Sequence, residues 1–207
     1  MYYPVKKSTI YYPDRSPTTV RVEVLLRSSP QDIYEVLLDN ENWTKWYVNM
    51  KSCVPLYAAN ANDYGNTKLP ATGRTVIVGD LHAKEEFISL QTNKVWGFTV
   101  YETNLPFFKQ MVERVVLQEM EIINAEVEVE GGDDDDDVKQ KTTTKTTTKT
   151  MTKVIYKAGI EFTPILGRIF QPIITKAMYD SWSKSLNALD DYILERKKKK
   201  TAANNVM

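Results

Sequence analysis

Few residues of this sequence are suited to proton transfer or metal binding. His82 is the only histidine and Cys53 the only cysteine, so no set of metal ligands is indicated, and no cofactor is expected. Cys53 is expected to be a small buried hydrophobic residue. His82 follows Gly79-Asp80-Leu81, where a turn is expected, and two interpretations stay open for it: a place on the surface or rim, or a general base.

Two neighbouring glutamates offer a further candidate. In AKEEF, Glu85 and Glu86 occupy successive positions of an expected strand, so they point to opposite faces. One carboxyl would then face the interior, where burial would suit it to proton transfer. The catalytic candidates are Glu86, Tyr156 and His82, although a hairpin-end or solvent-facing glutamate is the ordinary explanation of the pattern. No G-x-S-x-G motif and no glycine-rich phosphate loop occurs, and whether the chain is an enzyme stays open.

A row of apolar and aromatic residues indicates a pocket wall. Trp96 and Phe98 alternate along one expected strand, and Gln118 is the polar member of an apolar row in the next. An apolar wall with few polar groups is typical of a small-molecule site, and also of an ordinary packed core. The expected ligand-binding residues are Trp96, Phe98, Val116, Gln118, Met120, Tyr156, Phe170, Ile173, Ile174, Ala177 and Met178, with Ser181 beside them.

A long helix must position part of this wall. Apolar residues recur three and four apart over residues 162–197, which predicts an amphipathic helix. Thr163 and Pro164 are a plausible N-cap and first helical residue. Pro172 predicts either a kink or a short first helix that ends at Phe170, with a second beginning at Pro172.

Strands precede this helix. Alternating apolar residues predict seven of them, over 19–27, 51–59, 74–80, 83–91, 94–102, 111–129 and 152–162, with a bulge in the long 111–129 strand and loops at 61–73 and 104–110. Ser29-Pro30 begins a short helix, with Asp32 completing a capping box, and a second short helix carries Trp43 and Trp46. The predicted fold is α+β: a seven-stranded curved antiparallel sheet around a long C-terminal helix, with two short helices after the first strand.

Composition divides the chain into one domain with appendages. Residues 1–18 are expected to form an irregular arm, residues 19–196 the domain, and residues 197–207 a flexible basic tail. Within the domain, residues 131–150 combine five aspartates with a Lys/Thr repeat, which predicts a disordered loop insertion. A calcium-binding loop is the alternative, but the aspartate run lacks the spacing of an EF-hand.

The front of the chain resembles a known superfamily. RVEVLLRSSPQDIYEVLLDNENWTKWY is similar to the START-like (SRPBCC) superfamily, which includes polyketide cyclase/dehydrase-type proteins and lipid-transfer domains. The matching positions are Ser29-Pro30, Ile33-Tyr34, Val36-Leu37, Asp39, Trp43 and Trp46. The resemblance implies a helix-grip fold over residues 19–196, with a hydrophobic cavity between sheet and helix.

Three functions follow as hypotheses. The first is binding or transport of a hydrophobic small molecule or lipid in that cavity; the second is a polyketide cyclase/dehydrase-like enzyme using the same pocket; the third is a protein–protein adaptor with a filled core. A formal net charge of zero gives no case for nucleic-acid binding. Lys197, Lys198, Lys199 and Lys200 form either a solvated helix end or a contact with anionic membranes. Without a signal peptide or an apolar membrane span, a cytoplasmic protein is expected.

Overall fold

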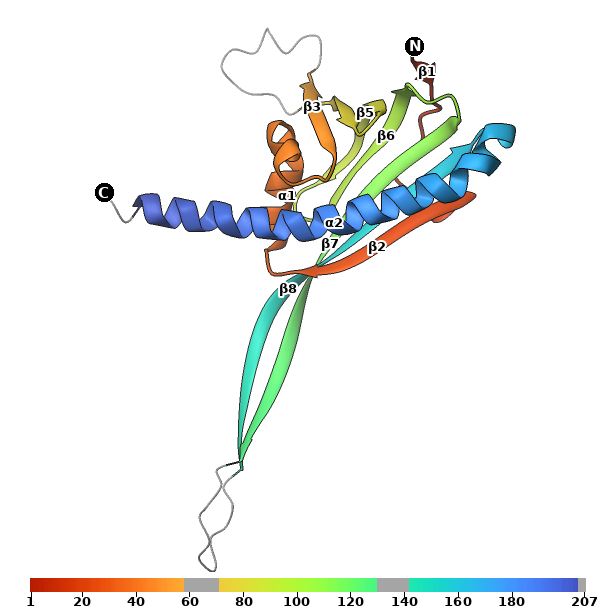
Figure 1. Ribbon diagram of the computed structural model, residues 1–207. Helices are drawn as coiled ribbons and strands as arrows, with labels where there is room; N and C mark the ends of the chain where they lie inside the picture. The colour runs from red at the N-terminus through yellow and green to blue at the C-terminus, as the bar shows by residue number, and fades with distance from the viewer. Residues whose placement is uncertain (58–70, 130–141, 205–207) are drawn as a thin grey trace, which may run out of the picture.

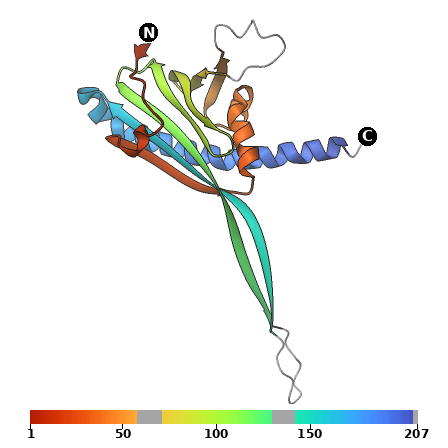
Figure 2. The ribbon, with the colours of Figure 1, turned by 180° about the vertical axis from the view of Figure 1, so that it is seen from behind.

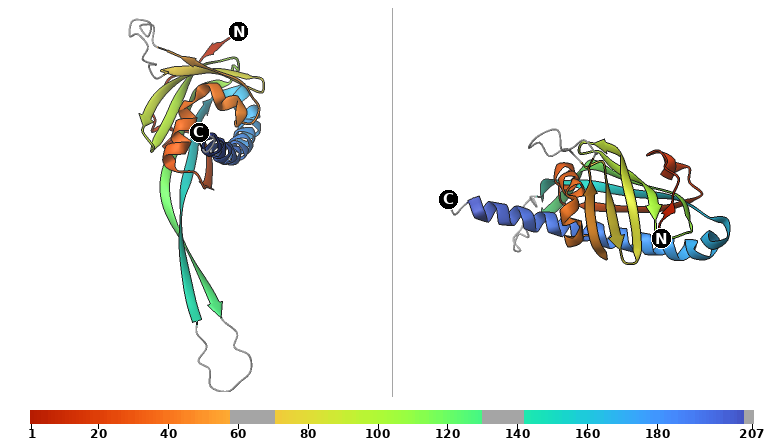
Figure 3. Two further views of the ribbon diagram at one scale, coloured as in Figure 1. Left: turned by 90° about the vertical axis from the view of Figure 1, so that its left-hand side faces the viewer. Right: turned by 90° about the horizontal axis from the view of Figure 1, so that it is seen from above.

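The computed structural model describes residues 1–57, 71–129 and 142–204, which form one curved antiparallel sheet around a long helix (Figure 1). Viewed along the helix, the sheet curls around it (Figure 3). The elements are β1 (Tyr3–Pro4), η1 (Tyr12–Asp14), β2 (Thr18–Leu26), α1 (Pro30–Leu38), η2 (Asn40–Lys45), β3 (Met50–Leu56), β4 (Gly73–Val78), β5 (Leu81–Gln91), β6 (Val95–Thr103), β7 (Phe108–Val129), β8 (Thr142–Phe162) and α2 (Pro164–Asn204).

The predicted α+β helix-grip architecture is confirmed. Seven strands pair in the order β2-β8-β7-β6-β5-β4-β3, and the short β1 adds to β6 outside this path. The predicted loop at 61–73 lies mostly outside the described residues. The predicted 104–110 loop is shorter than expected, because β7 already begins at Phe108 and its register shift falls between Phe108 and Gln110.

Local sequence fixes the turn from β2 into α1. The Ser29 hydroxyl accepts a hydrogen bond from the backbone N–H of Asp32 at 3.2 Å, and the Asp32 carboxylate accepts one from the backbone N–H of Ser29 at 3.3 Å. This is the predicted capping box, with Pro30 as the first helical residue. The adjacent Ser28 hydroxyl donates to Asp190 of α2 at 2.7 Å. The turn therefore anchors the long helix as well as starting the short one.

Helix α2 runs unbroken from Pro164 to Asn204 through Pro172, so the expectation of two separate helices was wrong. Its first turns lie at an angle to the remainder (Figure 1), as the alternative of a kink predicted. Pro164 begins the helix, but the Thr163 hydroxyl does not cap it, because that oxygen has no hydrogen-bond partner among the described residues. No helix in the described part of the chain is long and apolar enough to cross a membrane.

The prediction of a flexible basic tail over 197–207 is also wrong for residues 197–204, because α2 continues to Asn204. The Lys197 amine pairs with Asp32 at 2.6 Å, and Arg196 pairs with Asp39 at 3.2 Å, so contacts to the α1 region extend the helix. Lys198, Lys199 and Lys200 are exposed on its last turns. Their contact with anionic membranes stays a prediction.

Strands β7 and β8 continue together beyond the sheet as a two-stranded ribbon, which we define as Glu121–Val129 and Thr142–Thr150 (Figures 1 and 2). The prediction of a disordered loop over 131–150 was therefore wrong for Thr142–Thr150. These residues pair in unbroken register, from Glu121 opposite Thr150 to Val129 opposite Thr142. The reason is the threonine content of the segment, since β-branched side chains favour strands. Residues 131–141 lie outside the described residues.

The N-terminal arm, residues 1–17, lies on the outer face of the sheet, away from α2 (Figure 2). It is less irregular than predicted, because it contains β1 and η1, and the Val5 N–H donates to the Tyr101 carbonyl at 2.8 Å. Gly159 makes the close approach of the arm possible. A Cβ at Gly159 would lie only 2.6 Å from the Cα of Pro13. The arm thus buries the second face of the central strands.

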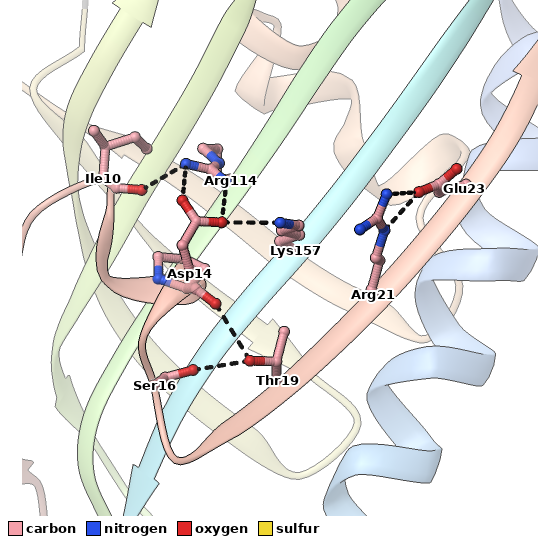
Figure 4. Close-up of polar contacts among 9 residues, drawn as sticks. Ile10, Asp14, Ser16, Thr19, Arg21, Glu23, Arg114 and Lys157 are labelled. Atoms are coloured by element: carbon pink, nitrogen blue, oxygen red, sulfur yellow. Dashed lines mark hydrogen bonds and ion pairs between the residues drawn. The ribbon is translucent and has the colours of Figure 1, made fainter.

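Asp14 fixes the arm to the sheet (Figure 4). Its carboxylate accepts hydrogen bonds from both terminal nitrogens of Arg114 on β7, at 2.8 and 2.9 Å, and from Lys157 on β8, at 2.9 Å. Arg114 also donates to the Ile10 carbonyl at 3.3 Å. The hydrogen bonds from Arg114 and then from Lys157 lower the pKa of Asp14 to about 2. One carboxylate therefore ties the arm to two strands.

We predict that Asp14→Asn lowers the free energy of unfolding by about 1 kcal/mol at neutral pH, a modest loss because the carboxylate is partly exposed and water screens its ion pairs. Since folding depresses the Asp14 pKa, the wild-type advantage is present above about pH 4 and is lost as the pH falls toward 2. Urea denaturation across this range measures it. Asp80→Asn, which alters an exposed carboxylate, should have no comparable effect; equal losses in the two variants would contradict the anchor.

Candidate functional site

A cavity of about 220 Å³ lies between α2 and the inner face of the sheet. Strands β4 to β7 form its floor, η2 and the segment after it close one end, and α2 forms its roof. The lining residues are Trp43, Tyr47, Met50, Arg74, Val76, Val78, Leu81, Ala83, Glu85, Phe98, Val100, Leu105, Phe108, Met111, Glu113, Ile174, Ala177, Met178, Ser181 and Trp182. Most of these side chains are apolar, as in small-molecule sites generally.

The two ends of the cavity differ in polarity and in access. At one end, which we call the closed end, the lining residues Trp43, Arg74, Glu85, Glu113 and Trp182 are all buried. At the other, which we call the mouth, the lining residues are apolar and partly accessible: Leu81, Leu105, Ile174 and Met178 are half-buried and Ala177 is exposed. The polar groups of the cavity therefore lie farthest from solvent.

An ion pair is buried at the closed end. Arg74 and Glu85 face each other across the β4–β5 ladder, and the Arg74 Nε donates to the Glu85 carboxylate. The guanidinium lies over the ring of Trp43 at 3.8 Å and near the rings of Trp96 and Phe98 at 4.9 and 5.0 Å. These π faces stabilise the cation where water cannot. Burial raises the pKa of Glu85 more than Arg74 lowers it.

A second carboxyl, that of Glu113 on β7, lies in the same dry space without a cation of its own. Burial, and next the negative charge of Glu85, raise the pKa of Glu113 to about 8. Tyr156, Arg74 and Trp182 oppose this shift but do not cancel it. Glu113 is therefore mostly protonated at neutral pH. Such a group can donate a hydrogen bond or a proton inside the cavity.

Two hydroxyls near Glu113, those of Tyr156 and Ser181, are incompletely hydrogen-bonded. The Tyr156 ring is fully buried and stacks on Trp182, with centroids 4.2 Å apart. Burial, and next the charge of Glu113, raise the pKa of Tyr156 well above its ordinary value. The Tyr156 hydroxyl interacts with Glu113 and the Ser181 hydroxyl with Tyr47, but neither makes a hydrogen bond of ordinary geometry in the described part of the chain. Because Ser181 lines the cavity, a ligand there can complete the hydrogen bonding of its hydroxyl.

Part of the predicted pocket wall lies where the sequence placed it. Phe98 lines the cavity from the sheet, and Ile174, Ala177, Met178 and Ser181 line it from α2. Trp96 and Tyr156 are completely buried beside the closed end but do not line the cavity. Ligand binding by these residues stays a prediction.

The predicted face of β7 was wrong. Val116, Gln118 and Met120 share the face of Arg114, which contacts the arm on the outer side, and Met120 is 40% exposed. The β7 residues that line the cavity are instead Met111 and Glu113, which lie on the opposite face of the strand. The arm explains the error, because it buries Val112 and so makes both faces of this strand apolar.

Two helix positions were also misplaced. Ile173 is 63% exposed, and Phe170 is 37% exposed with its ring stacked on Phe107 at 5.1 Å, so neither lines the cavity. Both belong to the long apolar stripe of α2. The sheet covers only part of that stripe, which periodicity alone could not reveal.

The catalytic candidates from the sequence lie outside the cavity. Glu86 pairs with Lys7 of the arm on the outer face, and Glu85 is the inward member of the pair. His82 is half-buried on β5, where its backbone N–H donates to Asn104 at 2.8 Å, and its side chain does not line the cavity. Tyr156 alone lies near the polar cluster, behind Glu113.

Arg74, Glu113 and Tyr47 were not predicted from the sequence, and the prediction of Glu86 was wrong, because Glu85 is the inward member of the pair. One signal was present: Glu113 is a charged residue within the apolar run MVERVV. A charge in such a run marks either an exposed face or a functional interior group. The described residues contain no group of three or more His, Cys, Asp or Glu side chains that could hold a metal ion. Cys53 is buried as expected, which raises its thiol pKa to about 11.

No protein-family model matches the chain, and no curated protein matches its sequence. Solved structures do match its fold. A START superfamily protein from Mycobacterium smegmatis aligns with a TM-score of 0.56 and 14% identity, over 86% of this chain and 97% of the other. The protein XoxI from Bacillus cereus aligns at 0.54 with 11% identity, over 87% and 98%. A protein from Thermus thermophilus aligns at 0.54 with 15% identity, over 86% and 99%. At these identities the likeness shows a START-like fold and nothing further. The fold that the resemblance in the sequence implied is thereby confirmed.

We predict that Glu85→Gln lowers the free energy of unfolding by about 3–5 kcal/mol, because it leaves the Arg74 charge buried and unpaired. Replacing both partners, as Arg74→Met with Glu85→Leu, should recover most of this loss, since neither charge then needs burial. Chemical denaturation measures both variants. Glu86→Gln, at the exposed neighbouring position, is the matched control; a loss in Glu85→Gln no greater than in this control would refute the buried pair.

For Glu113 we predict a pH dependence of stability opposite to that of Asp14. Its folded-state pKa of about 8 exceeds the ordinary 4.5, so as the pH rises between these values the unfolded chain loses the proton while the folded protein retains it. Wild-type stability should therefore fall across this window relative to Glu113→Gln, by on the order of 3–5 kcal/mol. Thermal or urea denaturation from about pH 5 to about pH 8 measures the difference. A constant difference between the two proteins would disprove the raised pKa.

Proposed function

We propose that this START-like chain binds a hydrophobic small molecule in the cavity between α2 and the sheet. The observation that carries the proposal is the cavity itself, with an apolar mouth and a closed end that holds unsatisfied polar atoms. Burying apolar ligand surface is worth about 25 cal/mol per Å² before the costs of association. The apolar walls thus supply affinity, and the polar cluster supplies orientation.

The cavity volume favours a compact ligand. About 220 Å³ holds roughly seven waters at ~30 Å³ each, and it lies below the ~300 Å³ typical of the smaller drug-sized sites. A single acyl chain or a small ring system fits this space better than a two-chain lipid. The partly accessible mouth at Ala177 and Met178 offers the route of entry. An unfilled cavity also argues against the filled core that the adaptor hypothesis required.

Catalysis in the same cavity is the second candidate, and Glu113 favours it. A carboxyl with a pKa of about 8 is suited to general acid–base work near neutral pH, and the Tyr156 hydroxyl lies behind it. A cyclase-like proton transfer would use this pair, not Glu86 or His82. Glu113→Gln separates the two functions, because it should leave the binding of a neutral apolar probe nearly intact while abolishing turnover of a substrate.

We predict that Ala83→Leu abolishes binding of a neutral apolar probe such as N-phenyl-1-naphthylamine, with at least about a tenfold loss of affinity. Ala83 is buried and lines the cavity, so the larger side chain occupies ligand space. Fluorescence titration measures the affinity, and circular dichroism with thermal unfolding verifies the fold. Gln91→Leu adds the same side chain at the exposed end of β5 and should bind like wild type. A folded Ala83→Leu protein that binds the probe normally would contradict the assignment of the cavity.

A further inference from the structure

The charges that line the cavity do not balance. Two carboxyls, those of Glu85 and Glu113, face one guanidinium, that of Arg74, which already pairs with Glu85. Among the described residues that line the cavity, no lysine, histidine or second arginine is present. The cluster therefore lacks one positive charge when both carboxyls are ionised. A bound proton or a ligand cation can supply it.

The titratable and polar groups around Glu113 come from every element packed against it. Arg74 and Glu85 act on it from β4 and β5, Tyr156 from β8, Tyr47 from the segment after η2, and Trp182 from α2. Apart from Arg74, none of these side chains carries a positive charge. The Ser181 hydroxyl, which lines the cavity, adds an oxygen that can accept a hydrogen bond.

Aromatic rings build the walls of this end. Trp182 packs edge-on against Tyr47 at 5.0 Å and against Trp43 at 6.2 Å, and it stacks on Tyr156 at 4.2 Å. Ring faces attract cations in desolvated sites, as Trp43 already does for the Arg74 guanidinium at 3.8 Å. The same environment suits a second, smaller cation placed next to Glu113.

We propose that the closed end binds the ammonium group of an amphiphilic amine, with the Glu113 carboxylate as its counter-ion and the apolar body of the ligand directed toward the mouth. This inference rests on the proposed ligand-binding function and names its ligand class. An ammonium has three donors, and from inside the cavity these can reach the Glu113 carboxylate and the Ser181 hydroxyl, which both line it. A carboxylate head would add a third negative charge beside Glu85 and Glu113. A neutral hydroxyl head would bring no positive charge, so the proton on Glu113 would still have to balance the cluster.

Proton release distinguishes these cases. The empty site holds a proton on Glu113 at neutral pH, and an ammonium bound beside this carboxyl displaces it. Amine binding should therefore release nearly one proton at about pH 7, and the apparent affinity should rise as the pH approaches 8. Above about pH 10 the free amine loses its own charge and the affinity should fall again.

The test compares three eight-carbon ligands with different head groups: octylamine, octanol and octanoate. Isothermal titration calorimetry near neutral pH, in two buffers with different heats of ionisation, gives both the affinity and the protons released. We expect octylamine to bind at least about tenfold more tightly than octanol, the minimum gain from one close desolvated charge pair, and octanoate to bind most weakly. In Glu113→Gln the preference for octylamine and the proton release should both disappear, while octanol binding is retained. Glu86→Gln, which alters the glutamate on the outer face, should behave like wild type.

The possible results separate the amine site from the more general ligand-binding function. Octanol or octanoate binding as tightly as octylamine overturns the amine site but leaves the ligand-binding function standing. The same holds if octylamine binds without proton release, or if Glu113→Gln keeps its preference. Failure of all three ligands and of the neutral apolar probe to bind the folded protein overturns the ligand-binding function itself.

Discussion

The buried Arg74–Glu85 ion pair is the interaction on which the inner side of this sheet depends. Moving two charges out of water costs several kcal/mol per ion, and the loss is recovered only where other groups replace the water. Here the pairing of β4 with β5 sets the two residues opposite each other, and four aromatic rings surround the guanidinium. Helix α2 closes the same space with Trp182. The dryness that this pair requires is also what raises the pKa of Glu113 and gives the cavity its chemistry.

The outer side of the sheet is organised by a different set of contacts, with consequences for the inner side. The N-terminal arm covers β6 to β8, and Asp14 holds it through Arg114 and Lys157. Because the arm and α2 cover opposite faces, residues on the two faces of β7, such as Val112 and Val115, are both fully buried. Strands β7 and β8 are therefore held between two layers before they leave the sheet as the ribbon. That support keeps the floor of the cavity in one register.

The architecture was predictable because its signals are local, whereas the site depends on distant partners. Alternation at Val20 and Val22 and the capping box at Ser29 and Asp32 determine their elements without help from elsewhere. In contrast, Glu85 and Glu86 are equivalent by alternation, and only pairing with Arg74 selects Glu85. On β7, Glu113 interrupts the inward row while the arm buries the outward one, so the apolar pattern favoured the wrong face. The strand at 142–150 was missed because its composition is polar, although threonine favours extended pairing.

The raised pKa of Glu113 is tested most directly by an NMR titration of its side-chain carboxyl in the ligand-free protein, with carbon-13 labelling and Glu113→Gln to assign the resonance. We predict a titration midpoint of about 8, because burial in the cavity and the neighbouring Glu85 carboxyl both disfavour the charged form of Glu113. A midpoint near the ordinary glutamate value of about 4.3 would show that water reaches the carboxyl. The closed end would then be open, and both the polar cluster and the ligand site built on it would be contradicted.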